Sequence, residues 1–124
     1  MPQYWRDFTG ANGIVRNSFH LTESDDESGL GADLTILTEE DSLDEATQCW
    51  PGIGVAPDGY VPVACCDGGS GDWFYINSND GTNGPLYRIY HDSVNEKGYE
   101  PSDAIAVVLK NYEKLLSFGA NNLT

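Results

Sequence analysis

His91 and Asp92 are the neighbouring residues whose types best suit acid–base chemistry, because a carboxylate can orient an imidazole that transfers a proton. Adjacent residues at the end of a strand point to opposite faces, so we expect the two side chains to lie apart. The sequence places no nucleophile beside them. We therefore interpret His91 as a hydrogen-bonded residue at a strand end, and we predict a protein that is not an enzyme and has no catalytic residues.

Metal binding is the second chemistry that the side chains allow. Nitrogen and sulfur ligands could come from two histidines and three cysteines, namely His20, His91, Cys49, Cys65 and Cys66. No CxxC or HxxxH spacing brings them together. Segments 67–72 and 77–81 contain the oxygen ligands that calcium prefers, but neither has the EF-hand spacing, and their Gly and Asn residues favour tight turns. We predict neither a metal site nor another cofactor.

The cysteines also bear on the cellular compartment. Their number is odd, and the adjacent pair Cys65 and Cys66 is poorly placed for a structural disulfide, so we expect reduced thiols. The first residues lack the basic and apolar regions of a signal peptide, and no run approaches the ~20 apolar residues of a membrane span. These features predict a cytoplasmic protein that binds no membrane.

The charge of the chain restricts its partners. Its 20 acidic and 6 basic residues leave a net charge of −14, which repels the phosphates of nucleic acids. A basic protein is the complementary partner. The same acidity could instead serve only to keep the protein soluble.

Length and composition predict a single domain with one modest core, since the chain has 124 residues of which 40% are hydrophobic. Trp5, Trp50 and Trp73 could stack on sugar rings, but in so small a domain we favour a place in the core or at its edge.

The N-terminal residues predict a short helix. Pro is tolerated at a helix start, and over residues 2–8 the aromatic side chains of Tyr4 and Phe8 are four positions apart and share one face. Asn12-Gly13 ends the helix, because both residue types accept positive φ. Residues 14–21 then form a weak strand candidate.

The next part alternates loops with short elements. Residues 22–33 lack apolar periodicity and indicate a solvated acidic loop, and residues 34–37 predict a strand. Thr38 has the spacing of an N-cap for a short acidic helix that runs through Ala46. Pro and Gly in residues 51–59 predict irregular backbone.

The segment from Tyr60 to Asp92 predicts a sheet. In its first strand Val61, Val63 and Cys65 share one face, and Pro62 lacks a backbone donor and belongs at a strand start or edge. Trp73 to Ile76 is apolar throughout, which is typical of a central strand covered on both faces. Leu86 to Tyr90 supplies another strand, and the turn-rich connection predicts an antiparallel meander.

The C-terminal part predicts an amphipathic helix that begins after Ser102 as N-cap. Its apolar residues recur at helical spacing: Ile105, Val108, Leu109, Tyr112, Leu115 and Leu116. Together the elements predict an α+β fold in which a mixed, mostly antiparallel sheet packs against helices, in a single domain over residues 1–124.

An ordered set of motifs resembles a known family. These are Pro2-x-Tyr4-x-x-x-Phe8-x-x-x-Asn12-Gly13, Tyr60-Val61-Pro62-Val63-Ala64, Asp67-Gly68-Gly69-x-Gly71-Asp72, Phe74-Tyr75-Ile76, Gly84-Pro85-Leu86-Tyr87 and Tyr90-His91-Asp92. In this order they resemble the SUKH superfamily, which includes fungal cell-wall-synthesis regulators and many bacterial immunity proteins. The resemblance spans most of the chain, but the helix that usually precedes the first motif is absent and residues 22–58 do not align.

The resemblance implies a non-enzymatic α+β domain without an obligatory cofactor. For bacterial members it implies a cytoplasmic immunity protein that binds and neutralises a cognate toxin, often a basic nuclease. The alternative is a regulatory or adaptor module that binds cellular proteins, as the fungal members do. An apolar strip left exposed near Trp5 and Phe8 would favour self-association, so we expect a monomer or a weak homodimer.

We expect the acidic loops and strand-edge turns to bind the partner, although the same charges could form a solvated face. The candidate partner-binding residues are Asp25, Asp26, Glu27, Glu39, Glu40, Asp41, Asp44, Glu45, Asp72 and Asp80.

Overall fold

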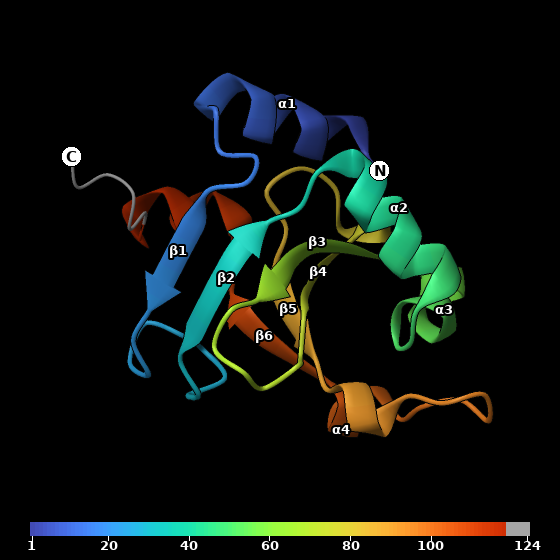
Figure 1. Ribbon diagram of the computed structural model, residues 1–124. Helices are drawn as coiled ribbons and strands as arrows, with labels where there is room; N and C mark the ends of the chain where they lie inside the picture. The colour runs from blue at the N-terminus through green and yellow to red at the C-terminus, as the bar shows by residue number, and fades with distance from the viewer. Residues whose placement is uncertain (119–124) are drawn as a thin grey trace.

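A computed structural model describes residues 1–118, which form a single α+β domain with a curled antiparallel sheet (Figure 1). The strands follow one another in the order β1-β2-β3-β4-β5-β6, and every neighbouring pair is antiparallel. Their bounds are Ser18–Leu21 (β1), Ala32–Ile36 (β2), Tyr60–Cys66 (β3), Phe74–Asn77 (β4), Leu86–Ile89 (β5) and Ile105–Leu109 (β6). The predicted fold class and the meander are therefore confirmed.

Short helices connect and cover the strands. The α-helices are α1 (Gln3–Asn12), α2 (Glu39–Gln48), α3 (Gly52–Val55) and α4 (Pro101–Ala104). The 3-10 helices are η1 (Ala56–Asp58), η2 (Ser78–Asp80), η3 (His91–Ser93) and η4 (Tyr112–Phe118). Among the described residues, no helix is long and apolar enough to cross a bilayer.

Local signals place α1 and α2 where the sequence predicts them. Helix α1 ends at Gly13, which has φ of +61° and donates its N–H to Gly10 O. In α2 the Thr38 hydroxyl accepts a hydrogen bond from Asp41 N at 3.1 Å, as an N-cap should.

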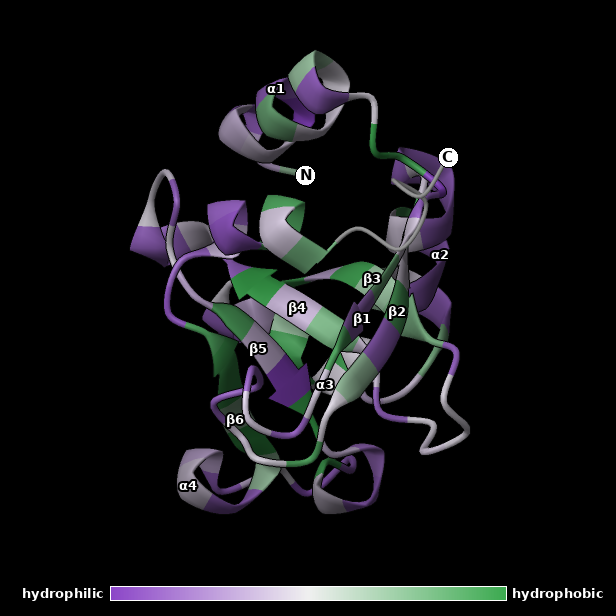
Figure 2. Cartoon of the chain, turned by 90° about the vertical axis from the view of Figure 1, so that its left-hand side faces the viewer, coloured by the Kyte–Doolittle hydropathy of each residue, from purple (hydrophilic) through white to green (hydrophobic). Residues whose placement is uncertain are grey.

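The sheet is buried on both faces at β4, whereas β1 and β2 leave one face largely exposed. The hydrophobic residues lie mainly on the strands (Figure 2). One core packs the sheet against α1 and η4, where Trp5 meets Tyr112 edge to face with ring centroids 5.1 Å apart. A second core contains Val55, Tyr75 and Ile89. All four residues of β4 are buried, so the prediction of a central strand is confirmed.

The aromatic residues of α1 are better covered than expected. Trp5 is 1% exposed, and Phe8 packs on Tyr112 with ring centroids 4.9 Å apart. The expected apolar strip is therefore not open. Trp50 differs from the core assignment, because it is 46% exposed.

The prediction for Pro62 is wrong. Strand β3 lies inside the sheet between β2 and β4, and Pro62 is opposite Tyr75. The register shifts between Pro62 and Ala64, so a bulge accommodates the missing backbone donor. The bulge also breaks the alternation: Val63 belongs to the first core, but Cys66 rather than Cys65 packs against it.

The predicted C-terminal helix is also wrong. Residues 105–109 form β6, which pairs with β5. The helix directly before them is the short α4, Pro101–Ala104. The run Ile105-Ala106-Val107-Val108-Leu109 is rich in β-branched residues that suit a strand, and its pairing with β5 outweighs the helical spacing. Tyr112 and Leu115 are buried from the 3-10 helix η4 instead.

Two connections differ in detail from expectation. Strand β1 begins only at Ser18, so residues 14–17 belong to a turn region. Segment 51–59, expected to be irregular, forms the short helices α3 and η1.

The cysteines are free thiols, as predicted. The single domain was predicted over residues 1–124, of which 119–124 lie outside the described residues.

Candidate functional site

The outer face of α2 is the candidate site. Three carboxylates, Glu39, Glu40 and Asp41, occupy the first turn, where the positive end of the helix dipole favours them. The opposite side of the helix is held against the sheet, because the Ser42 hydroxyl donates to Pro62 O at 2.5 Å. This bond orients α2 so that its carboxylates face solvent.

Leu43 is 62% exposed, and its helical spacing places it beside Glu39 and Glu40, four and three residues earlier. Beside it a hollow of about 240 Å³ opens between α2 and β3, with Ala46, Tyr60 and Val61 among its walls. An exposed aliphatic side chain next to a hollow, with carboxylates on the same helix, has the anatomy of a protein interface: an apolar centre and a polar rim.

The charges on this face are largely uncompensated. Glu39 accepts from Arg6 Nη2 at 2.6 Å, and both side chains remain exposed. Glu40, Asp41 and Asp44 form no ion pair with any residue in the range 1–118. We name Glu39, Glu40, Asp41, Leu43 and Asp44 together the α2 face.

Glu45 does not belong to the α2 face, although the sequence predicted it there. Its side chain points inward and the residue is 9% exposed. Burial raises the pKa of its carboxyl group, and a hydrogen bond from the Cys49 thiol opposes this only in part. Glu45 lies one helical turn after Asp41 on the same side of α2, but nearer to α3, where it is buried, so it is a structural residue.

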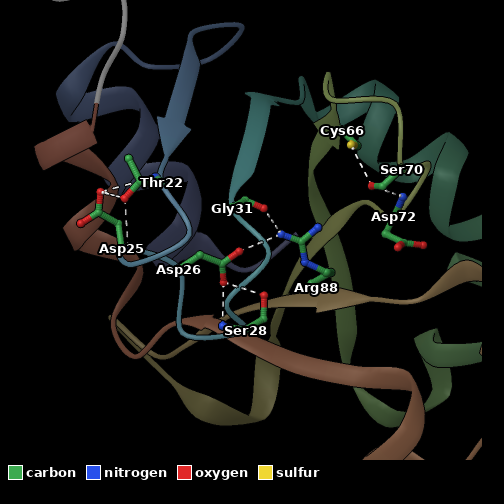
Figure 3. Close-up of polar contacts among 9 residues, drawn as sticks. All are labelled: Thr22, Asp25, Asp26, Ser28, Gly31, Cys66, Ser70, Asp72 and Arg88. Atoms are coloured by element: carbon green, nitrogen blue, oxygen red, sulfur yellow. Dashed lines mark hydrogen bonds and ion pairs between the residues drawn. The ribbon is translucent and has the colours of Figure 1, made fainter.

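Asp26 is also misassigned, because it is buried rather than available to a partner. Its Oδ2 accepts from Arg88 Nη2 at 2.8 Å, and its Oδ1 accepts from the Ser28 N–H and hydroxyl, both at 2.7 Å (Figure 3). Arg88 also donates to Gly31 O and lies over the Phe74 ring, 5.0 Å from its centroid. Asp26 therefore fastens the loop between β1 and β2 to β5.

The other predicted acids lie elsewhere on the molecule. Asp25 and Glu27 are exposed in the β1–β2 loop, at the opposite end of the molecule from α2 (Figure 1). Asp72 is half-buried and accepts from His91, while Asp80 accepts from the Tyr87 hydroxyl at 2.7 Å. The structure thus gathers four of the ten predicted residues on one face and disperses the rest.

His91 has partners that the sequence did not indicate. Its Nδ1 lies 2.5 Å from Asp72 Oδ1, and its Nε2 lies 3.2 Å from Asp92 Oδ1. The hydrogen bond to Asp72 raises the pKa of the imidazole. The expectation that His91 and Asp92 lie apart is therefore wrong, because both belong to the 3-10 turn η3 rather than to a strand. Both ring nitrogens face carboxylates, and no nucleophile among the described residues bonds to them.

Sequence reasoning missed two residues, Arg88 and Leu43. Arg88 lies between Tyr87 and the buried Ile89 in an apolar strand, and such an arginine signals a buried acidic partner. Leu43 lies between Ser42 and Asp44, and its exposure could not be foreseen without knowing which side of α2 meets the sheet.

Comparison with known proteins adds no relative to these observations: no family model, curated protein or solved structure matches the chain.

Proposed function

We propose that the protein is a non-enzymatic protein-binding domain that uses the α2 face to bind a basic protein. The observation that carries this proposal is the exposed Leu43 beside a hollow, on a helix where Glu40, Asp41 and Asp44 pair with no cation among residues 1–118. Leu43 would enter an apolar site on the partner, and the carboxylates would meet its lysines and arginines. Such charges accelerate association and select the partner more than they add affinity.

The partner class follows from the charge and from the SUKH resemblance. We propose that the protein is an immunity protein and that its partner is a toxin domain with a basic surface, such as a nuclease. The net charge of −14 would steer the protein toward that surface. Bound there, the carboxylates of the α2 face would occupy the place of nucleic-acid phosphates.

The test is co-expression with the toxin-like reading frame nearest the gene, scoring cell survival and co-purification at two salt concentrations. We expect rescue and a complex that weakens at high salt, because exposed charges are screened. A partner of ordinary cellular function, without toxicity, would favour the adaptor alternative. Absence of rescue and of any complex would contradict the proposal.

Two variants with equal total charge locate the interface. The triple variant E40K/D41K/D44K reverses the α2 face, and E23K/E27K/E113K reverses exposed acids away from it. We expect the first to weaken binding by about tenfold or more, since exposed ion pairs contribute ~0.2–1 kcal/mol each and repulsion is added. The second should change binding far less. Equal weakening would mean that net charge, not the α2 face, determines binding.

A further inference from the structure

A cavity of about 540 Å³ lies away from the α2 face, between the β1–β2 loop and the β3–β4 loop. Apolar walls come from Leu21, Leu30, Ala32 and Phe74, and polar ones include His20, Asp33, Cys66, Ser70, Asp72 and Arg88. Cys66 packs against the first core, and it also lines this cavity, away from the proposed interface.

The Cys66 thiol is surrounded by hydrogen-bond donors. Its Sγ lies 3.1 Å from Ser70 Oγ (Figure 3), and hydrogen bonding from the backbone of Gly68, Ser70 and Gly71 favours the thiolate and lowers the pKa of the thiol. Gly71 has φ of +80°, a conformation that glycine adopts without strain and that turns successive N–H groups inward. Burial raises the pKa of the thiol, but these donors outweigh burial and lower its pKa overall.

The other two thiols have the opposite environment. The negative charge of Glu45 raises the pKa of Cys49, although Cys49 is exposed. Burial, followed by the charge of Asp67, raises the pKa of Cys65. The surroundings of the three thiols thus shift their pKa values in different directions. Those of Cys66 stabilise the thiolate, and those of Cys49 and Cys65 do not.

Arg88 is an independent sign that an acceptor can occupy the same cavity. Its side chain is only 4% exposed, and both of its hydrogen bonds, to Asp26 and to Gly31 O, use Nη2. Its Nε has no partner among residues 1–118, and Nη1 makes no hydrogen bond to them either. In Figure 3 the unbonded Nη1 points away from Asp26, toward the loop that carries Ser70 and Asp72. Nε is itself buried away from solvent, so of these two nitrogens Nη1 is the one that can donate to an oxygen acceptor in the cavity.

We propose that Cys66 is a modification site, a thiol that hydrogen peroxide oxidises to sulfenic acid inside this cavity. The thiolate sulfur attacks one peroxide oxygen, a sulfur–oxygen bond forms and the oxygen–oxygen bond breaks. The leaving hydroxide takes up a proton and becomes water. The sulfur is oxidised by two electrons, the peroxide is reduced, and the new oxygen adds an acceptor to the cavity that Arg88 also lines.

The product should persist, because no second thiol is placed to condense with it. Cys65 is adjacent in the chain but its Sγ faces Asp67 Oδ1 at 3.8 Å, and neighbouring strand residues point to opposite faces. Cys49 follows α2, on another part of the molecule. A sulfenic acid at Cys66 is therefore available to a trapping reagent such as dimedone.

The test treats the folded protein at pH 7 with hydrogen peroxide and dimedone and follows the adduct by mass spectrometry. Three variants that keep one thiol each, C65S/C66S, C49S/C66S and C49S/C65S, give the rate at Cys49, Cys65 and Cys66 separately. We expect Cys66 to react at least about threefold faster than the exposed Cys49, because the gain in thiolate outweighs the loss of nucleophilicity. S70A in the C49S/C65S background should slow the reaction, while S102A, an exposed serine elsewhere, should not.

Thermal melting of each variant establishes that it is folded, and peptide mapping of the wild-type protein gives the same order of reactivity without any substitution. Equal rates at the three thiols, or faster reaction at Cys49, would overturn the proposal. A faster reaction at Cys66 that S70A leaves unchanged would overturn the role given to the loop.

Discussion

Asp26 and Arg88 form a buried ion pair across 62 residues of sequence, with Oδ2 and Nη2 2.8 Å apart and side-chain exposures of 0% and 4%. The pair ties the β1–β2 loop to β5. Next to it, Glu27 N donates to Val108 O at 2.8 Å and ties the same loop to β6. An acidic loop that looks solvated in the sequence therefore joins the first strands of the sheet to the last.

Removing one partner of this pair should destabilise the fold strongly. We expect D26A to lower the free energy of unfolding by about 3–5 kcal/mol, because it leaves the Arg88 charge buried and uncompensated. Urea denaturation measures this change. The control E23A removes an exposed carboxylate of the same loop and should change stability by less than about 0.5 kcal/mol. The double variant D26L/R88M should be more stable than D26A, since no lone charge remains buried; a loss as large as that of D26A would contradict this.

Glu45 should make stability depend on pH. Burial raises its pKa in the folded protein above the ordinary value of 4.5, so the fold favours the neutral acid. Its stabilising contribution is present below the unfolded-state pKa and is lost as pH rises through the folded-state pKa. We expect E45Q to be more stable than the wild type at pH 7 and to lose that advantage near pH 4, by thermal melting across pH. E40Q, at an exposed position, is the matched control; an equal effect there would exclude burial as the cause.

His91 should titrate above its ordinary value of 6.5, because its hydrogen bond to Asp72 favours the imidazolium. The stabilisation of the fold by the His91–Asp72 pair is fully present below the unfolded-state pKa of His91 and is lost as pH rises through its folded-state pKa. NMR titration should show the pKa of His91 fall in D72N and fall less in D92N, since Asp92 is the weaker influence. A larger fall in D92N would mean that the pairing with Asp72 does not persist in solution.

Leu115 and Leu116 distinguish the observed C-terminal structure from a continuous amphipathic helix, which would bury both. In η4 Leu115 is fully buried and Leu116 is 42% exposed. We expect L115A to cost about 2–5 kcal/mol, as loss of a core leucine does, and L116A less than about 1 kcal/mol. Chemical denaturation of the two variants gives the comparison. Similar losses would favour the continuous helix.

Sequence alone predicted the elements whose signals are local. The Thr38 cap and the acids after it identify α2, and the unbroken apolar run at residues 73–76 identifies the central strand β4. Four residues of the candidate site, Glu39, Glu40, Asp41 and Asp44, follow from the same acidic helix, because the first turn of a capped helix is itself readable from the chain.

Only the tertiary structure decided the features that depend on distant partners. Residues 105–109 have helical spacing but become β6 because β5 offers them an edge, and Pro62 enters a central strand because a bulge absorbs its missing donor. Asp26 and Glu45 resemble their exposed neighbours in the sequence, yet burial removes both from the surface. Local propensity determines which short segments form, whereas burial and strand pairing, which join residues far apart in the chain, determine which charges remain exposed to bind a partner.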